Sequence, residues 1–291
     1  MLLPVLMALC AVALVLFFLL LPGESDTAMR SPFWGVNFAH RGLHSQDKSV
    51  PENSLAAFTA AIDGEYGIEL DVRLTKDGQV VVFHDDTLDR MCGVPGRVDS
   101  FTWEQLQEYR LLETEHGIPL LWDVLDLVDG RIPLLIELKM APGAQRRALC
   151  EKTWKILRTY DGDICIESFD PRMVRWFKRH VPGLLRGQLA AHPGAMAKAS
   201  PIGVVVGLGL ANCLGRPHFI AYQYGKKPLT IKLAERFCMR FAWTLRSQEQ
   251  GDAAEDVNEG VIFEFYQPLP RFAQPPGEPE NAPDPDEPYR F

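Results

Sequence analysis

Residues 68–84, Ile-Glu-Leu-Asp-Val-Arg-Leu-Thr-Lys-Asp-Gly-Gln-Val-Val-Val-Phe-His, constrain the fold more than any other segment of the chain. Two apolar, β-branched runs at 68–74 and 80–84 flank an Asp-Gly pair, which is typical of a tight hairpin. Parallel neighbouring strands need a connection of about a dozen residues or more, so these two runs are predicted to be antiparallel. We therefore expect 80–84 to fold back as a flap from the end of strand 68–74.

Outside this hairpin, short apolar runs alternate with helical patterns, which is typical of a parallel α/β domain. Strands are expected at 36–40, 68–74, 134–139, 164–168, 185–189, 219–222, 241–245 and 261–265. Helices are expected at 52–64, 144–160, 171–180 and 229–239. With the flap set apart, the strand number is that of a TIM (β/α)8 barrel, and the sequence predicts this α/β fold over residues 30–266.

An apolar segment without charge occupies residues 1–21. Its length matches what a helix needs to cross a bilayer, and it exceeds the usual apolar core of a signal peptide. We expect a transmembrane anchor over residues 1–22 that holds the protein at a membrane by a single span, with a cleaved signal peptide as the alternative. Arg30 is the only basic residue close to the span, so the side of the membrane on which the domain lies stays open.

Residues 267–291 are rich in Pro and acidic side chains. Such a segment cannot bury enough apolar surface to offset the entropy of ordering it, so a disordered tail is expected there. The formal net charge of -8 argues against a nucleic-acid partner, which would require clustered Lys and Arg.

Ionisable residues stand at the carboxyl ends of consecutive expected strands, where catalytic groups of a β/α barrel gather. These residues are His40 and Arg41, Glu69 and Asp71, His84 on the flap, and Glu137 and Lys139. Three carboxylates that converge on one barrel mouth would repel one another unless a cation lay between them. All-oxygen ligation favours one divalent cation, Mg²⁺ or Ca²⁺. The alternative is a buried salt-bridge network with Arg41 and Lys139.

The remaining side chains of this set suit phosphate chemistry. Arg41 and Lys139 add fixed positive charge beside the expected metal, and such charge can hold a phosphate group. Histidine titrates near neutral pH, so His40 and His84 are suited to act as general base and general acid. The pattern therefore favours an enzyme that acts on a phosphate ester.

Short motifs follow one another in order through the first half of the domain. They are Ala39-His40-Arg41-Gly42, Pro51-Glu52-Asn53-Ser54, Glu69-Leu70-Asp71-Val72, Val82-Phe83-His84-Asp85 and Ile136-Glu137-Leu138-Lys139. With these motifs the chain resembles the glycerophosphodiester phosphodiesterase family. The resemblance implies a TIM barrel and a metal-dependent hydrolase that converts a glycerophosphodiester into glycerol 3-phosphate and an alcohol.

The resemblance also implies a role for each matching residue. His40 and His84 would be the catalytic acid/base pair, and Glu69, Asp71 and Glu137 the metal ligands. Arg41 and Lys139 would hold the phosphate, while Glu52 would lie near the substrate or brace Arg41. Glu52 has an alternative reading, because an acidic residue at the start of helix 52–64 would complement the helix dipole.

One departure from the family lies in the last expected strand. Many members carry Gly-Ile-Ile-Thr-Asp there, whereas this chain carries Gly260-Val261-Ile262-Phe263-Glu264. We expect this change to touch none of the proposed catalytic residues. Besides hydrolysis of small soluble glycerophosphodiesters, two functions stay open: lysophospholipase D-like hydrolysis of membrane lysophospholipids, which the anchor suggests, and a catalytically inactive barrel that only binds a ligand.

Overall fold

The computed structural model describes residues 2–200 and 202–275 of the 291-residue chain. In this part, nine strands form one sheet in the order β1-β9-β8-β7-β6-β5-β4-β2-β3, and β1 also pairs with β2. The pairing of β1 with β2 closes eight parallel strands into the predicted TIM barrel. The strands are β1 Val36–Ala39, β2 Gly67–Leu74, β3 Val80–Val82, β4 Leu134–Leu138, β5 Ile164–Ser168, β6 Arg186–Ala190, β7 Phe219–Gln223, β8 Met239–Leu245 and β9 Gly260–Phe263.

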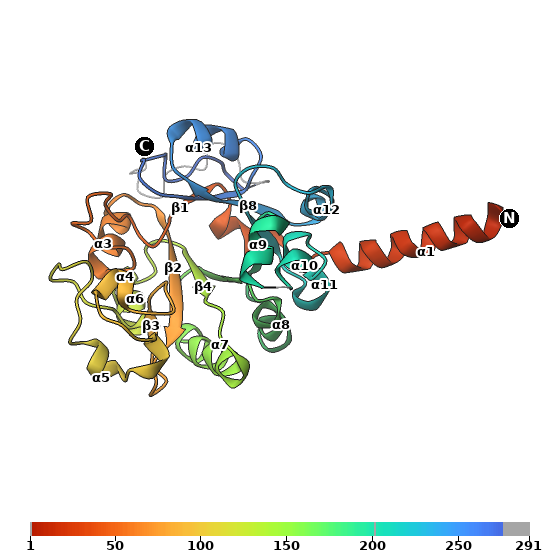
Figure 1. Ribbon diagram of the computed structural model, residues 1–291. Coiled ribbons are helices and arrows are strands. Elements are labelled where there is room, and N and C mark those ends of the chain that lie inside the picture. Colours follow the sequence, from red (N-terminus) through yellow and green to blue (C-terminus); the bar gives the residue numbers. More distant parts are fainter. Residues whose placement is uncertain (1, 201, 276–291) are drawn as a thin grey trace, which may run out of the picture.

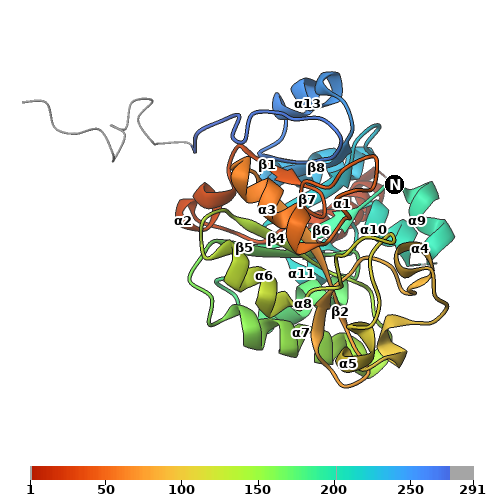
Figure 2. The ribbon, with the colours of Figure 1, turned by 90° about the vertical axis from the view of Figure 1, so that its left-hand side faces the viewer.

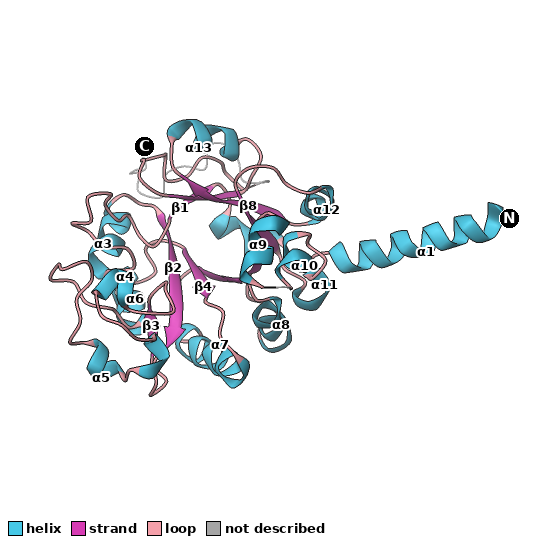
Figure 3. Cartoon of the chain, in the orientation of Figure 1, coloured by secondary structure: helices cyan, strands magenta, loops and turns pink. Residues whose placement is uncertain are grey.

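Helices surround this barrel (Figures 1 and 2), and one long helix projects away from it (Figure 1). Figure 3 shows the strands at the centre with helices outside them. The α-helices are α1 Leu2–Leu20, α2 Thr27–Arg30, α3 Leu55–Asp63, α4 Asp89–Cys92, α5 Trp103–Leu106, α6 Leu121–Val128, α7 Gly143–Leu157, α8 Pro171–His180, α9 Pro193–Ala199, α10 Gly203–Gly207, α11 Asn212–Gly215, α12 Leu229–Ala234 and α13 Gln248–Glu255. Three 3-10 helices are η1 Ser31–Phe33, η2 Val98–Ser100 and η3 Glu235–Phe237.

The barrel interior is filled by aromatic and aliphatic side chains. The ring of Phe241 stacks on Phe38 and on Phe219, with centroids 5.8 and 4.4 Å apart. Alternate residues of a strand share a face, so the side chains two positions further along these strands also face inward. Leu135 of β4 belongs to this apolar cluster, and Glu137 lies two residues beyond it. The interior therefore changes from apolar to ionisable toward the carboxyl ends of the strands.

The predicted flap is confirmed. β3 pairs antiparallel with β2, with Val72 opposite Val82 and Leu74 opposite Val80. The turn between them uses Gly78 at φ +81°, a conformation that residues with a side chain rarely adopt. The strand ends at Val82, so His84 lies just beyond the flap rather than on it.

Several predicted boundaries differ from the structure by a few residues, and three of the differences change how a segment is assigned. Helix α3 begins at Leu55 because the hydroxyl of Ser54 accepts the backbone N–H of Ala57 at 3.1 Å and caps the helix. Glu52 therefore lies in the loop before the helix. The helix predicted at 229–239 ends as α12 at Ala234 and continues only as the 3-10 turn η3.

The third difference lies at the carboxyl end of the barrel domain. The predicted boundary at residue 266 is too early, because the next residues pack on β1. The backbone N–H of Asn37 donates to Pro270 at 2.9 Å, and Phe272 N–H donates to Gly35 at 2.7 Å. The phenol of Tyr66 also donates to the carbonyl of Pro268. These hydrogen bonds offset the entropy of ordering the segment. The rest of the predicted tail, 276–291, lies outside the described residues.

Helix α1 is the one described helix that is long and apolar enough to cross a membrane. Its window Leu3–Leu20 has a mean hydropathy of 2.9, and only 6% of it is buried against the rest of the chain. Length and composition suit a membrane anchor and would equally suit a signal sequence.

Candidate active site

Glu69, Asp71 and Glu137 lie together at the carboxyl end of the barrel. Glu69 and Asp71 share a face of β2, and Asp71 is in register with Glu137 on β4. One oxygen of each carboxylate lies within 4.8 Å of the others, and all three residues are buried. Burial and the charges of Asp71 and Glu137 raise the pKa of Glu69 well above its ordinary value. The surrounding protein therefore leaves negative charge in this cluster incompletely balanced.

Two cationic side chains flank the cluster. Lys139 Nζ lies 2.9 Å from Glu137 Oε1 and 3.4 Å from Asp71 Oδ1, and Arg41 Nε lies 3.4 Å from Asp71 Oδ2. Burial opposes ionisation of Asp71, but Lys139 and Arg41 hold the pKa of its carboxyl group well below the usual range. Among the described residues, Asp71 Oδ1 and Glu137 Oε1 are paired only with the ammonium group of Lys139, and neither makes a well-aligned hydrogen bond. Buried carboxylate oxygens of this kind fit a hard divalent cation.

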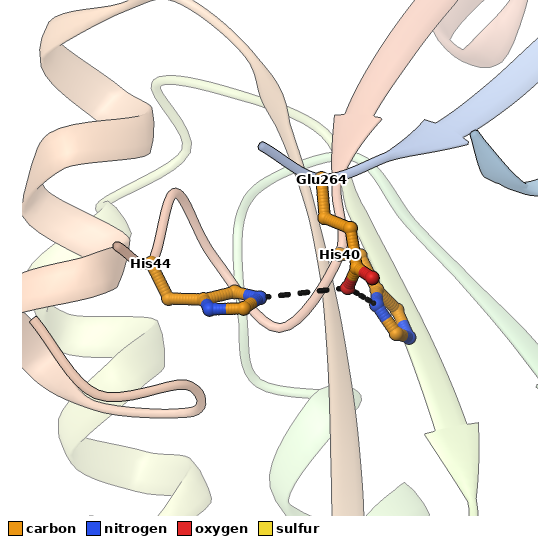
Figure 4. A group of neighbouring side chains, drawn as sticks. All are labelled: His40, His44 and Glu264. Carbon is orange, nitrogen blue, oxygen red and sulfur yellow. Dashed lines mark hydrogen bonds and ion pairs between the residues drawn. The ribbon is translucent and has the colours of Figure 1, made fainter. Parts of the chain in front are cut away.

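His40 follows β1 and points toward Glu264, which follows β9 (Figure 4). These strands pair in parallel, so their carboxyl ends are neighbours. His40 Nδ1 lies 2.7 Å from Glu264 Oε2, and His44 Nε2 lies 3.6 Å from the same oxygen. Burial opposes ionisation of Glu264, yet the hydrogen bond from His40 and the nearby ring of His44 hold its pKa below the usual range. We expected that the replacement of the family's Asp by Glu264 would affect none of the proposed catalytic residues. The contact between Glu264 and His40 shows that this expectation is wrong.

The pairing with Glu264 determines the tautomer of His40. An ionised carboxylate accepts a hydrogen bond, so Nδ1 carries the proton and Nε2 keeps its lone pair. His40 Nε2 lies 4.0 Å from Glu69 Oε2. Burial lowers the pKa of His40 to about 4, although Glu264 opposes this shift. His40 is therefore a neutral imidazole at neutral pH in the cation-free chain.

His84 belongs to a chain of ion pairs that ends at Arg41. His84 Nδ1 lies 2.6 Å from Asp85 Oδ1, and Arg90 Nε donates to Asp85 Oδ2 at 2.6 Å. Arg90 also donates to both oxygens of Glu52 at 2.7 and 2.8 Å, and Arg41 Nη1 donates to Glu52 Oε1 at 2.7 Å. Glu52 thus braces Arg41. The helix-dipole reading of Glu52 is wrong, because this residue precedes the cap of α3.

A cavity of about 150 Å³ lies at the barrel mouth. Its wall is formed by His40, Arg41, Glu69, His84, Glu137, Lys139, Glu167, Phe169, Leu189, Trp243, Thr244, Arg246 and Ile262. The structure therefore brings most of the predicted site residues to one cavity. Asp71 and Glu52 lie behind the wall, where they contact Arg41.

Seven residues of this wall were not predicted as site residues, and Glu167 is the only one of the seven that carries a carboxylate. Glu167 of β5 is in register with Glu137 and is buried, and its Oε2 has no hydrogen-bond donor among the described residues. Burial and the charge of Glu69 raise its pKa well above the ordinary value. The sequence feature that could have indicated Glu167 as a site residue is its carboxylate, which interrupts the otherwise apolar strand 164–168. Trp243 packs edge to face on Phe169, with ring centroids 5.6 Å apart.

Comparisons with known proteins agree with this fold. A model of the "Glycerophosphoryl diester phosphodiesterase family" matches residues 40–259. A glycerophosphodiester phosphodiesterase from Caldanaerobacter subterraneus is 38% identical over 165 residues, which are 52% of this chain and 65% of that relative. The alignment thus spans less than two thirds of that relative's length.

Solved structures show the same fold. A glycerophosphodiester phosphodiesterase from Thermotoga maritima has a TM-score of 0.59 at 26% identity, covering 78% of this chain and 93% of that one. A phosphodiesterase from Oleispira antarctica, solved in complex with its product sn-glycerol-3-phosphate, has a TM-score of 0.65 at 19% identity, covering 79% and 93% of the two chains.

Proposed function

The chain belongs to the glycerophosphoryl diester phosphodiesterase family, and from this premise we propose that it hydrolyses glycerophosphodiesters to glycerol 3-phosphate and an alcohol. The observation that carries the proposal is the mouth cavity, where histidines, carboxylates and cations from separate strands face one another. The structural neighbour from Oleispira antarctica holds sn-glycerol-3-phosphate as its product, which supports glycerol 3-phosphate as one half of the substrate.

Glu69, Asp71 and Glu137 are proposed to hold one divalent cation, Mg²⁺ or Ca²⁺. Their mutual distances, their burial and the raised pKa of Glu69 support this assignment. When bound, such a cation supplies positive charge that stabilises the charge developing on the phosphate group.

His40 is proposed as the general base. The Nδ1 proton of His40 is donated to Glu264, so Nε2 is the nitrogen that can take a proton from the attacking water or substrate hydroxyl. Burial favours the neutral imidazole that this step requires. Glu264 does not line the cavity wall and would act through His40, as a positioning residue.

His84 is proposed as the general acid. Its Nδ1 faces the carboxylate of Asp85, which orients the ring and leaves Nε2 to donate a proton to the departing alcohol oxygen. Arg41 and Lys139 are proposed to bind the phosphate oxygens. The successive ion pairs of Arg90 with Glu52 and of Glu52 with Arg41 hold the Arg41 guanidinium in place. Less rotamer entropy is therefore lost when phosphate binds.

The substrate class is proposed to be soluble glycerophosphodiesters. A second candidate, hydrolysis of lysophospholipids, is favoured by one observation, the apolar helix α1 beside the barrel. The test is release of glycerol 3-phosphate from glycerophosphocholine and of lysophosphatidic acid from lysophosphatidylcholine, with the full chain in detergent micelles. Hydrolysis of the lipid alone would overturn the first choice. No product from either substrate would favour the catalytically inactive barrel.

The same assay tests the metal and the base. Treatment with a chelator is expected to abolish turnover, and added Mg²⁺ or Ca²⁺ to restore it. His40→Ala is expected to lower turnover by about 10²–10⁴-fold, the usual contribution of a positioned general base. His116→Ala, at a half-buried histidine outside the mouth cavity, is the matched control. Near-normal turnover in His40→Ala would overturn the catalytic assignment.

A further inference from the structure

The barrel holds the end of helix α1 through specific contacts. Leu20 is buried in an apolar cluster of the barrel, and its carbonyl accepts the side-chain amide of Asn212 at 3.0 Å. Arg216 Nη1 donates to the carbonyl of Phe18 at 2.9 Å, and the ring of Phe17 packs edge to face on Phe237 at 5.9 Å. Figure 1 shows α1 leaving the barrel beside α10, α11 and α12. The direction of the helix relative to the barrel is therefore set by the fold.

An exposed apolar stripe lies next to this junction. Leu229, Leu233 and Phe237 follow one another at intervals of four residues along α12 and η3, and they are 71%, 40% and 56% exposed. They line an apolar hollow of about 480 Å³ together with Leu16 and Leu20 of α1. Isolated exposed apolar residues are ordinary on protein surfaces, whereas a contiguous apolar patch marks an interaction site. A bilayer entered by α1 would meet this stripe first.

Basic side chains gather beside the same junction, although the chain as a whole has a net charge of -8. Arg175, Lys178 and Arg179 lie on α8, and Arg216 lies after α11 with its guanidinium 4.6 Å from the centre of the Phe18 ring. Gly215, next to Arg216, packs directly against Val174 and the backbone of Arg175 on α8, so these cations are close together. Burial and then the charges of neighbouring arginines, Arg216 foremost, lower the pKa of Lys178.

The cations of this cluster have no acidic partner in contact among the described residues. Within the part of the chain that the structure describes, none of the four forms a salt bridge, and the guanidinium of Arg216 donates to backbone carbonyls at the end of α1. Lys232 and Arg236 add exposed positive charge on α12 and η3. Clustered Lys and Arg next to a membrane helix attract anionic lipid headgroups, each strengthening binding by about fivefold.

We propose that the apolar stripe of α12 and η3, together with the basic cluster of α8 and Arg216, forms a docking surface for an anionic phospholipid bilayer. The stripe enters the boundary between headgroups and acyl chains, and the basic cluster contacts the headgroups. The surface would hold the barrel against the membrane that α1 enters. This inference depends on α1 being a membrane span and is independent of the hydrolase reaction.

The test uses the full chain in lipid nanodiscs, with one chain per disc so that a second copy cannot cover the stripe. Leu233→Cys is labelled with a membrane-impermeant maleimide, and the rate is read at that peptide by mass spectrometry. Trp122→Cys is the matched control, because Trp122 is a 55% exposed apolar residue on α6. Both rates are divided by those of the denatured chain. Phe237→Cys is a second probe should Leu233→Cys fail to fold.

On discs containing phosphatidylglycerol, Leu233→Cys is expected to react about tenfold more slowly than Trp122→Cys, because the bilayer covers the stripe. The docking equilibrium should weaken by about fivefold for each charge removed, so most of this protection should be lost on phosphatidylcholine discs and in a variant with Arg175→Gln and Lys178→Gln. Equal rates for the two cysteines of the parent chain on phosphatidylglycerol discs would overturn the docking surface. If the protection is the same on both kinds of disc and in the variant with the Gln substitutions, the role of the basic cluster would be overturned. A chain that does not co-elute with the discs would overturn the inference and leave the proposed hydrolase reaction intact.

Discussion

Two groups of ionisable side chains share the barrel mouth, and their charges are balanced in opposite ways. In the first group, Glu69, Asp71 and Glu137 are buried together, and burial and repulsion raise the pKa of Glu69. In the second, the carboxylate of Glu264 accepts a hydrogen bond from His40 and lies 3.6 Å from His44, and its pKa is held low. The first group consists of three carboxylates, and the second consists of one carboxylate and two histidines, His40 and His44. In both groups the ionisable atoms lie within 4.8 Å of one another.

The difference shows that residue type alone does not determine what a carboxylate does. Glu69 and its neighbours share an excess of negative charge, which favours the binding of an added cation. Glu264 already has a proton donor in His40, so its charge is used to orient that ring. The two groups are therefore expected to respond differently to loss of a single carboxylate.

The largest effect is expected for Glu69→Gln in the first group. Turnover restored by Mg²⁺ or Ca²⁺ should fall by about a thousandfold or more, because the cation contributes several kcal/mol of charge stabilisation. The cation-free variant should unfold at the same temperature as the parent or higher, because one charge is removed from a repelling, buried set. Turnover and thermal unfolding without cation check both parts. Glu65→Gln, at an exposed loop position, is the control. A large drop in both turnover and stability would mean that Glu69 is structural.

A smaller effect is expected for Glu264→Gln in the second group. The turnover number should fall by about 10–100-fold with little change in KM, because the ring of His40 loses its orienting partner. Glu264 also raises the pKa of His40, so the acidic limb of the pH–rate profile should move to lower pH. Glu264→Asp keeps the charge with a shorter reach and should retain more activity. An unchanged pH profile in Glu264→Gln would contradict the positioning role.

The smallest effect is expected for Arg246→Gln. Arg246 also pairs with Glu264, but its side chain is 59% exposed, so water screens the interaction. Exposed ion pairs contribute about 0–1 kcal/mol, and turnover should change by less than about fivefold. The ratio kcat/KM and the unfolding temperature measure this effect. A loss as large as that of Glu264→Gln would show that Arg246 acts directly on the substrate.

Much of the fold was predictable because its signals are local. The hairpin at 75–79, the alternating apolar runs and the strand-end residues each depend on neighbours within a few positions. Helix and strand ends were placed less well, since Ser54 as a cap and the packing of Phe272 on Gly35 depend on particular hydrogen bonds. Glu167 was missed because one carboxylate in an apolar run does not indicate which side chains it will face.

The sequence by itself determined which strands carry ionisable ends and that Glu69 and Asp71 share one face, because the side-chain period of a strand is two. Only the tertiary structure placed Glu264 against His40, 224 residues away. Closure of the barrel makes the first and last strands neighbours, and a local pattern carries no information about that contact. The same reason applies to α1 and α12, whose apolar faces meet only once the barrel has formed.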